Sequence, residues 1–397
     1  MSRNQPISSF HPPRRMLMGP GPSDVHPRVL AAMAQPTVGH LDPAFIGMMD
    51  EVKALLQLAF RTGNELTMPV SGPGSAGMEA CFVNLLEPGD TAIVCINGVF
   101  GTRMRENVER CGAKAVVVED AWGTPVDPDK VAAALKANPG AKLLAFVHAE
   151  TSTGVRSDAA TLCKLARERG VLTIVDAVTS LGGIPVLVDE WNADAVYSGT
   201  QKCLSCVPGL SPVTFGPRAV EALSKRKAKG QSWFLDFSLI TAYWGGGAKR
   251  AYHHTAPVNT LYALHESLVM LEEEGLENAW ARHARMHEGL KAGLEAMGLS
   301  LLVAPDSRLP QLNAVTVPAG IDEAQVRSQM LSRYGLELGA GLGALAGKIW
   351  RIGLMGQSAT PGHVTACLGG LEAVLAEMKA PIEIGAALPA ASKVLFP

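Results

Sequence analysis

The chain has 397 residues, a formal net charge of −2 at pH 7 and 47% hydrophobic residues. This length predicts about two to three domain-sized units, and the near-neutral charge argues against a surface for nucleic acid or anionic membranes. No apolar run approaches the roughly 18 residues of a membrane-spanning helix. Seven cysteines, an odd number in a chain of this length, predict free thiols and a cytoplasmic location.

The first 15 residues contain three arginines, three prolines and no acidic residue. The prolines disfavour the amphipathic helix of a transit peptide, so we expect residues 1–15 to form an arm that lies on a partner subunit. A proline- and glycine-rich loop follows at 19–22. The apolar residues of 43–60 recur with a helical period, which predicts a helix there.

Strands and helices then alternate over about 150 residues. Short apolar strands are predicted at 66–70, 91–96, 115–118, 143–147 and 171–175 and just before residue 199, and helices at 77–86, 101–111, 127–137 and 159–169. Continuous apolar strands are typical of a mostly parallel sheet that helices cover on both faces. Polar loops follow five of these strands and should converge at one edge of the sheet. These loops are 71–75, 97–101, 148–154, 176–180 and 199–202.

The pattern changes from about residue 267. A long helical stretch at 261–297 precedes short strands near 299–303 and 312–317, a helix at 323–334, a strand at 348–352 and a last helix at 361–378. This order predicts a smaller C-terminal α+β domain at 275–397, beside a large domain at 16–274.

Lys202 and Asp176 stand at the ends of two predicted strands. A lysine amine can form a Schiff base with the aldehyde of pyridoxal 5'-phosphate (PLP). A carboxylate can pair with the pyridinium nitrogen of the same cofactor and strengthen the ring as an electron sink. Either residue alone at a strand end is common, but the pair predicts a PLP site.

The segment from Gly72 to Gly77 lies between a predicted strand and a predicted helix. Backbone N–H groups at such a helix start can bind a phosphate, and Ser75 can add a hydroxyl or simply cap the helix. Gly72, Gly74 and Gly77 also match G-x-G-x-x-G, so an NAD-dependent oxidoreductase is an alternative. That alternative requires an acidic residue at the end of the next strand, where the sequence has Asn97.

Five further residues are candidate ligands, and three of them, Phe100, Thr151 and Arg351, have a second interpretation. Phe100 can stack on a cofactor ring or fill the core, and Thr151 can bind the ring hydroxyl or cap a turn. Tyr252 and Thr255 lie in a polar segment before a helix and are candidate phosphate ligands. Arg351 offers a bidentate fork for a substrate carboxylate, or forms a surface ion pair.

No metal site is predicted. Cys203 and Cys206 have the spacing of a metal-binding pair, but no second pair accompanies them, so we expect them to pack beside Lys202. His253 and His254 are neighbours in sequence, and adjacent histidines rarely converge on one ion.

Eight motifs, in order over about residues 16–380, make the chain resemble the class V, fold-type I PLP aminotransferases of the alanine/serine–glyoxylate aminotransferase family. The motifs are Met18-Gly-Pro-Gly-Pro22, Gly39-His-Leu-Asp-Pro43, Ser71-Gly-Pro-Gly-Ser75, Glu150-Thr-Ser-Thr-Gly154, Val175-Asp-Ala177, Ser198-Gly-Thr-Gln-Lys202, Tyr252-His-His-Thr255 and Trp350-Arg-Ile-Gly353. The resemblance implies the α/β fold of that family. It also implies a homodimer with active sites at the subunit interface.

The resemblance also implies roles for individual residues. Lys202 would hold PLP and transfer the proton between substrate and cofactor, and Asp176 would pair with the ring nitrogen. The other implied cofactor contacts are Gly74, Ser75, Phe100, Thr151 and Gln201, with Tyr252 and Thr255 reaching the phosphate of the neighbouring subunit. The implied substrate contacts are Arg351, His40 and Gly21. The chain has Pro73 where the family often has serine, and proline offers neither an N–H nor a hydroxyl, so one phosphate contact is expected to be missing or replaced. It has Phe100 at the ring-stacking position, where the family often has tryptophan.

The resemblance leaves the amino donor open among alanine, serine and ureidoglycine. A ureidoglycine-using branch of the family is expected to carry amide side chains at the positions of His40 and Tyr252. Histidine and tyrosine there favour alanine or serine as donor and glyoxylate as acceptor, in a ping-pong reaction. The alternative is (S)-ureidoglycine–glyoxylate transamination in purine breakdown.

Overall fold

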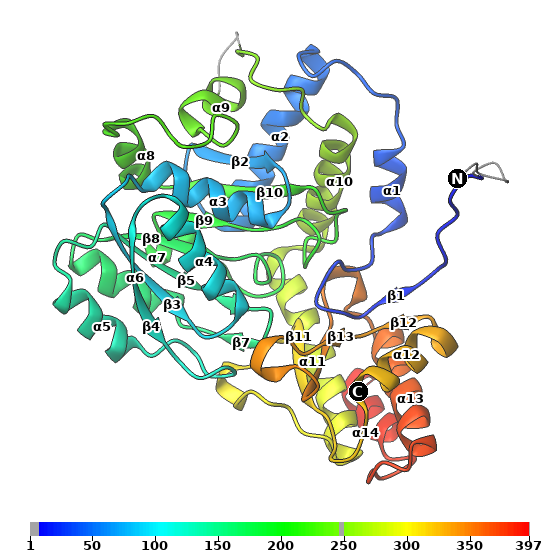
Figure 1. The fold of residues 1–397 in the computed structure, drawn as a ribbon. Helices are drawn as coiled ribbons and strands as arrows, with labels where there is room; N and C mark the ends of the chain where they lie inside the picture. Colours follow the sequence, from blue (N-terminus) through cyan, green and yellow to red (C-terminus); the bar gives the residue numbers. More distant parts are fainter. Residues whose placement is uncertain (1–7, 246–249, 397) are drawn as a thin grey trace, which may run out of the picture.

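A seven-stranded sheet forms the centre of the computed structural model, which describes residues 8–245 and 250–396 (Figure 1). In spatial order its strands are β2 (Leu66–Ser71), β10 (Leu210–Phe215), β9 (Ala195–Tyr197), β8 (Leu172–Asp176), β5 (Leu143–Val147), β3 (Thr91–Ile96) and β4 (Lys114–Glu119). Strand β10 is antiparallel to both of its neighbours, and the other pairs are parallel. The predicted α/β fold with a mostly parallel sheet is confirmed, although the sequence pattern did not predict β10.

Helices flank this sheet (Figure 1). They are α1 (Pro27–Met33), α2 (Pro43–Phe60), α3 (Gly74–Leu85), α4 (Val99–Arg110), α5 (Pro128–Ala137), α6 (Ala159–Glu168), α7 (Val188–Trp191), α8 (Pro217–Ser224), α9 (Phe237–Trp244) and α10 (Val258–Glu274). Strands β5 and β8 are buried along their whole length, which explains their continuous apolar sequence. A short hairpin of β6 (Ala149–Glu150) and β7 (Val155–Arg156) follows β5.

Local sequence fixes where several of these helices begin. Asp42 and Asp127 each precede a proline, and each accepts a hydrogen bond from the backbone N–H two residues further on (2.8 and 2.9 Å). Asp158 caps α6 by accepting the N–H of Thr161 (3.1 Å). An aspartate cap and a proline at the first helical position both favour a helix start, so these starts lie within one residue of the predicted ones.

A smaller domain follows, beginning at α11 (Leu276–Ala296). Its antiparallel sheet has the order β11 (Leu312–Thr316), β14 (Ile349–Gly353) and β13 (Gly339–Ala340). Its other elements are α12 (Glu323–Tyr334), α13 (Pro361–Glu377), α14 (Ala387–Leu395) and the 3-10 turns η1 (Pro305–Ser307), η2 (Gly343–Leu345) and η3 (Gly356–Ser358). Its core, which includes Trp350, is separate from the core of the large sheet. No helix in the described ranges is long and apolar enough to cross a membrane.

Gly275 separates two helices where the sequence predicted one helical stretch at 261–297. Its φ of 83° lies in the left-handed region that favours glycine and that an α-helix does not contain. Helix α10 therefore ends before Gly275, and α11 begins after it. The prediction of a strand near 299–303 was also wrong. Within the described residues, Leu301 forms only an isolated bridge to Val315.

The segment before α1 packs with the smaller domain. Strand β1 (Met16–Leu17) pairs in parallel with β12 (Leu336–Glu337), and Met18 is buried in the core of the smaller domain. The large domain is predicted to begin at residue 16, and these contacts join its first residues to β12 and to the second core. Of the predicted arm at 1–15, residues 1–7 lie outside the described part of the chain, and 8–15 are almost all exposed and outside any helix or strand.

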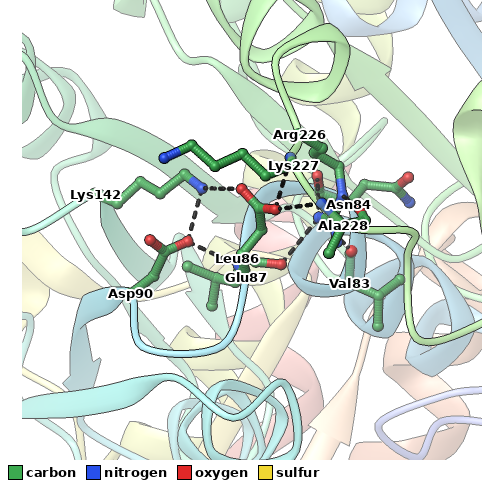
Figure 2. Close-up of polar contacts among 9 residues, drawn as sticks. All are labelled: Val83, Asn84, Leu86, Glu87, Asp90, Lys142, Arg226, Lys227 and Ala228. Carbon is green, nitrogen blue, oxygen red and sulfur yellow. Dashed lines mark hydrogen bonds and ion pairs between the residues drawn. The ribbon is translucent and has the colours of Figure 1, made fainter.

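The C-terminal end of α3 is fixed by an arginine from a distant segment (Figure 2). Arg226 Nη1 donates to the carbonyl oxygens of Val83, Asn84 and Leu86 at 2.8, 2.9 and 2.9 Å. Glu87 accepts in return from the N–H groups of the two residues after Arg226. These charge-assisted bonds satisfy carbonyl groups that a helix end leaves without partners, and they anchor the helix whose other end reaches the sheet edge.

Helix α3 also approaches β10 closely at Gly77. A Cβ atom added to Gly77 would lie 1.9 Å from Ser211 Oγ and 2.9 Å from Ser211 Cβ. Glycine has only a hydrogen at this position, and this allows α3 to lie close against the sheet. Its first residue, Gly74, therefore reaches the carboxyl edge, where an added Cβ would lie 3.6 Å from Gly199 Cα.

This contact predicts that Gly77→Ala destabilises the protein by about 1–3 kcal/mol, because overpacking against Ser211 outweighs the roughly 1 kcal/mol gained in helix propensity. Gly369→Ala in α13 is the matched control, since its nearest neighbour would be Leu388 Cδ1 at 3.9 Å. The control should stabilise the protein by up to about 1 kcal/mol. Urea unfolding measures both changes, and equal effects would contradict the close contact.

Candidate active site

Loops that follow the sheet strands meet at one edge, as the parallel topology predicted. A Cβ added to Gly74 would lie 3.2 Å from Val178 Cγ2, which places the start of α3 against the loop after β8. The hydroxyls of Thr151 and Thr179 lie 2.5 Å apart and join the loops after β5 and β8. Ser198 Oγ donates to a carbonyl oxygen of the loop after β8 at 2.9 Å. These contacts assemble one site from distant parts of the sequence.

Asp176, the last residue of β8, is a buried carboxylate with two internal partners. Its Oδ2 accepts from the Tyr197 hydroxyl at 2.6 Å, and its Oδ1 accepts from the Val178 N–H at 2.8 Å. Burial raises the pKa of Asp176 to about 7, against the lowering effect of these two hydrogen bonds. Each oxygen keeps a free lone pair, so the carboxylate can accept a further donor.

Lys202 is buried and faces the N-terminal segment. Its amine donates to the carbonyl oxygen of Pro20. A Cβ on Gly21 would lie 2.5 Å from Lys202 Nζ, and the φ of Gly21 is +104°, so both space and backbone require glycine there. Burial lowers the pKa of Lys202 to about 8, with the charge of Arg351 as a second cause. A substantial fraction of the amine is therefore neutral and nucleophilic near neutral pH.

Arg351 lies in the middle of β14 and is only 6% exposed. Its Nε donates to the Ala340 carbonyl at 2.7 Å, and its Nη1 donates to the Thr151 carbonyl at 3.1 Å. Burial lowers the pKa of Arg351 to about 10, whereas the charge of Glu150 raises it. No carboxylate forms an ion pair with this guanidinium within the described residues, so it can still receive the carboxylate of a ligand.

The start of α3 is a candidate phosphate cradle. Pro73 occupies the N-cap position and provides no side-chain cap, so the amides of Gly74 and Ser75 begin the helix without acceptors in the described chain. Gln201 Oε1 is buried and has no hydrogen-bond partner within the described residues. The departure at Pro73 removes one N–H and one hydroxyl, and it leaves the following amides in place.

Phe100 is the second residue of α4 and is half-buried. The Arg103 guanidinium lies 4.9 Å from the centroid of the Phe100 ring. The backbone N–H of Phe100 donates to Glu150 Oε2 at 3.2 Å. Thr151 is fully buried, and the hydroxyl of Thr179 occupies part of its hydrogen-bonding capacity. Phe100 and Thr151 thus contact the loops that carry the charged residues of the site.

Tyr252, Thr255 and His40 are not joined to this charged cluster within the described chain. Tyr252 is 61% exposed, and its hydroxyl lies 3.5 Å from that of Thr255. The rings of His40 and Tyr252 are 5.2 Å apart, and His40 Nε2 is buried without a partner. These three residues form a separate group, which we call the rim.

Two members of the site were not predicted from the sequence. Tyr197 pairs in register with Asp176 across β9 and β8, and this pairing brings its hydroxyl to the carboxylate. Glu150 is fully buried and accepts hydrogen bonds from Phe100 and Ser152. For Tyr197 a signal existed, because the ends of neighbouring parallel strands lie side by side. For Glu150 there was none beyond its place in a polar loop.

The residues present fit a phosphorylated pyridine aldehyde. The site offers an amine with a lowered pKa at Lys202, a buried acceptor at Asp176 and free helix-start amides at Gly74 and Ser75. The described chain holds no group of three or more His, Cys, Asp or Glu side chains suited to a metal ion.

The family model for aminotransferase class-V matches residues 17–354. The chain is 40% identical to alanine–glyoxylate aminotransferase of Rattus norvegicus over 350 residues, which cover 88% of this chain and 84% of that protein. The crystal structure of alanine–glyoxylate aminotransferase from Nostoc sp. has a TM-score of 0.91 and 44% identity, and the match covers 94% of this chain and 100% of that chain. The structure of ureidoglycine–glyoxylate aminotransferase from Bacillus subtilis has a TM-score of 0.95 and 41% identity, and the match covers 98% and 99% of the two chains. Both the sequence match and the shared architecture show that the chain belongs to the class V aminotransferases.

Proposed function

We propose that this aminotransferase uses PLP to transfer the amino group of alanine or serine to glyoxylate, which gives glycine and the 2-oxo acid. The observation that carries this proposal is the burial of Lys202, Asp176 and Arg351 in one site formed by both domains. When bound, the cofactor supplies an aldehyde for amine capture and a protonated ring as electron sink. Family membership favours this function over an oxidoreductase built on Gly72, Gly74 and Gly77.

Each charged residue has a role that follows from its surroundings. Lys202 would hold the cofactor through Nζ and would accept or return a proton at that atom, which its lowered pKa favours. Asp176, oriented by Tyr197, would face a protonated ring nitrogen. Arg351 would bind the α-carboxylate that donor and acceptor share.

The remaining cofactor contacts follow from the loops around the charged residues. The amides of Gly74 and Ser75, together with the side-chain NH₂ of Gln201, would hold the phosphate at the start of α3. Phe100 would stack on the ring, and Thr151 would lie near the ring hydroxyl. The half-buried position of Phe100 and the full burial of Thr151 support this placement.

The rim supports alanine or serine as donor, because His40 and Tyr252 provide no amide to bind a ureido group. (S)-Ureidoglycine is the second candidate donor. It is favoured by the TM-score of 0.95 to the Bacillus subtilis enzyme and by that match's coverage of 98% of this chain. Gly21 would contact the substrate beside the amine, where any side chain would collide with Lys202.

A homodimer is part of this proposal. Tyr252 of the rim is 61% exposed, and Trp233 and Phe234, which pack on the adjacent His253 and His254, are 64% and 40% exposed. Exposed apolar side chains of this kind are typical of an interface. A partner subunit bound there would receive Tyr252 and Thr255 near its phosphate, and the arm at 1–15 would lie on it.

Seven free, buried cysteines support a reducing, cytoplasmic compartment. The separate cores support a division into 16–274 and 275–397, apart from the first residues noted above.

The direct test is the visible absorption spectrum of the purified protein. A band from covalently bound cofactor should be bleached by L-alanine or L-serine and should be absent in Lys202→Ala. This variant should keep its fold and lose turnover by about 10³-fold or more. Lys225→Ala, which changes an exposed lysine in α8's C-cap, should match wild type. Bleaching by ureidoglycine alone would instead support the second donor, and an active Lys202→Ala would refute the proposed role.

Arg351→Ala should raise KM for the amino donor and for glyoxylate together, by about 10- to 100-fold, because both would lose the same charge-assisted hydrogen bonds. Steady-state kinetics with each substrate varied in turn measures this change. Arg333→Ala removes an exposed arginine paired with Glu377 and should leave both KM values unchanged. A change confined to one substrate would show that the two carboxylates bind at different places.

Asp176 predicts a pH dependence in the cofactor-free protein. Its pKa in the folded state is raised to about 7, so it stabilises the fold at low pH, and this contribution is lost as pH rises through 7. The unfolding free energy of wild type minus that of Asp176→Asn should therefore fall between pH 4 and pH 8 by on the order of 4 kcal/mol. Urea unfolding at several pH values measures the difference. If this difference in unfolding free energy did not change with pH, the pKa of Asp176 would not be raised in the folded protein.

A further inference from the structure

Glu150 is a buried carboxylate to which the proposed function gives no role. It is 0% exposed and ends β6. Its Oε1 accepts from the N–H and hydroxyl of Ser152 at 3.0 and 2.6 Å, and its Oε2 accepts from the N–H of Phe100 at 3.2 Å. The carboxylate therefore bridges its own turn and the first turn of α4.

This carboxylate takes the place of a helix cap. Gly98 is the N-cap residue of α4 and provides no side-chain cap. A Cβ on Gly98 would lie 2.5 Å from Glu150 Cδ and from Ser152 Oγ, so no side chain fits there while Glu150 is in place. A negative charge at the positive end of a helix, bonded to its free N–H groups, fixes the first turn. Phe100 is the second residue of that turn.

The same turn holds Arg351. The carbonyl of Thr151, the residue after Glu150, accepts from Arg351 Nη1 at 3.1 Å. The hydroxyl of Thr151 lies 2.5 Å from that of Thr179, three residues after Asp176. The charge of Glu150 raises the pKa of both Asp176 and Arg351, which indicates that all three lie within electrostatic reach.

We propose that Glu150 is a positioning residue of the aminotransferase site, whose carboxylate fixes Phe100 through α4 and Arg351 through the Thr151 carbonyl. This inference rests on the proposed function, in which Phe100 faces the cofactor and Arg351 binds the substrate carboxylate. Glutamine cannot replace Glu150, because its amide nitrogen is a donor and cannot accept the N–H groups on one of the two sides. In Glu150→Gln, either the N–H of Phe100 at the start of α4 or the N–H of Ser152 therefore loses its acceptor.

The first experiment is hydrogen–deuterium exchange of the full-length chain, with and without PLP. In Glu150→Gln, amides in the first turn of α4 should exchange about 10-fold faster or more. Asp322→Asn is the matched control, since it neutralises an aspartate that accepts two N–H groups at the start of α12 (2.9 and 3.1 Å). It should leave α4 unchanged. Wild-type exchange of α4 in Glu150→Gln would overturn the link between this carboxylate and the helix.

The second experiment is a double-mutant cycle on the dissociation constant of PLP. Glu150→Gln and Phe100→Ala should each weaken PLP binding about 10-fold, and the double variant should bind no more weakly than Phe100→Ala, because Glu150 acts through the ring. Additive losses would overturn this step. KM for glyoxylate should rise severalfold in Glu150→Gln, with kcat within about threefold of wild type. A fall in kcat at unchanged KM would overturn the link to Arg351.

Wild-type protein measured in parallel separates the two proposals. If wild type neither binds PLP nor transfers an amino group, the proposed function fails, and the exchange experiment alone decides whether Glu150 fixes α4. If wild type is active and Glu150→Gln matches it in exchange, PLP affinity and KM, the positioning role fails and the proposed function stands.

Discussion

Four charged side chains buried in one site set the main physical constraint on this structure. Lys202, Arg351, Asp176 and Glu150 are each at most 8% exposed. Transfer of an ion from water to a protein interior costs several kcal/mol. Burial accordingly raises the pKa of both carboxylates and lowers that of both cations. Two anions and two cations offset each other in part, and Asp176 and Lys202 remain able to change protonation near neutral pH.

The fold supplies these four groups from separate segments and then ties the segments together. Asp176 ends β8 of the large sheet and Glu150 ends β6 in the hairpin after β5, whereas Arg351 comes from β14 of the smaller domain. The N-terminal segment connects the two: the Ser23 hydroxyl donates to the Lys202 carbonyl at 2.7 Å, and the N–H of Gly353 donates to the Met18 carbonyl at 2.7 Å. The pairing of β1 with the smaller domain is therefore part of how Lys202 and Arg351 are held at a fixed separation.

Local patterns predicted the elements that are defined locally. Strands β3 and β5 and helix α12 have the predicted bounds, because apolar runs and caps mark them in the sequence. Strand β10 was missed; in the structure its Pro212 lies opposite Pro69 of β2, so both strands of this pair contain a proline. Lys202 and Asp176 stood out as chemical groups at strand ends. Glu150 and Tyr197 did not, because their roles depend on partners brought from other elements.

The buried charged residues and the rim differ in how well they tolerate substitution. Removal of one partner from a buried charge cluster leaves another charge uncompensated, whereas an exposed substitution usually changes stability by no more than about 0.5 kcal/mol. Alanine, serine, ureidoglycine and glyoxylate all carry a carboxylate, which Arg351 would bind in the proposed function, so the donors would have to be distinguished by their remaining groups. In the proposed function His40 and the exposed Tyr252 are the candidates for this discrimination, because both lie outside the buried charged cluster. Solved structures that share this fold and are 44% and 41% identical to this chain are named for different donors, alanine and ureidoglycine, so the fold and the overall identity do not by themselves fix the donor.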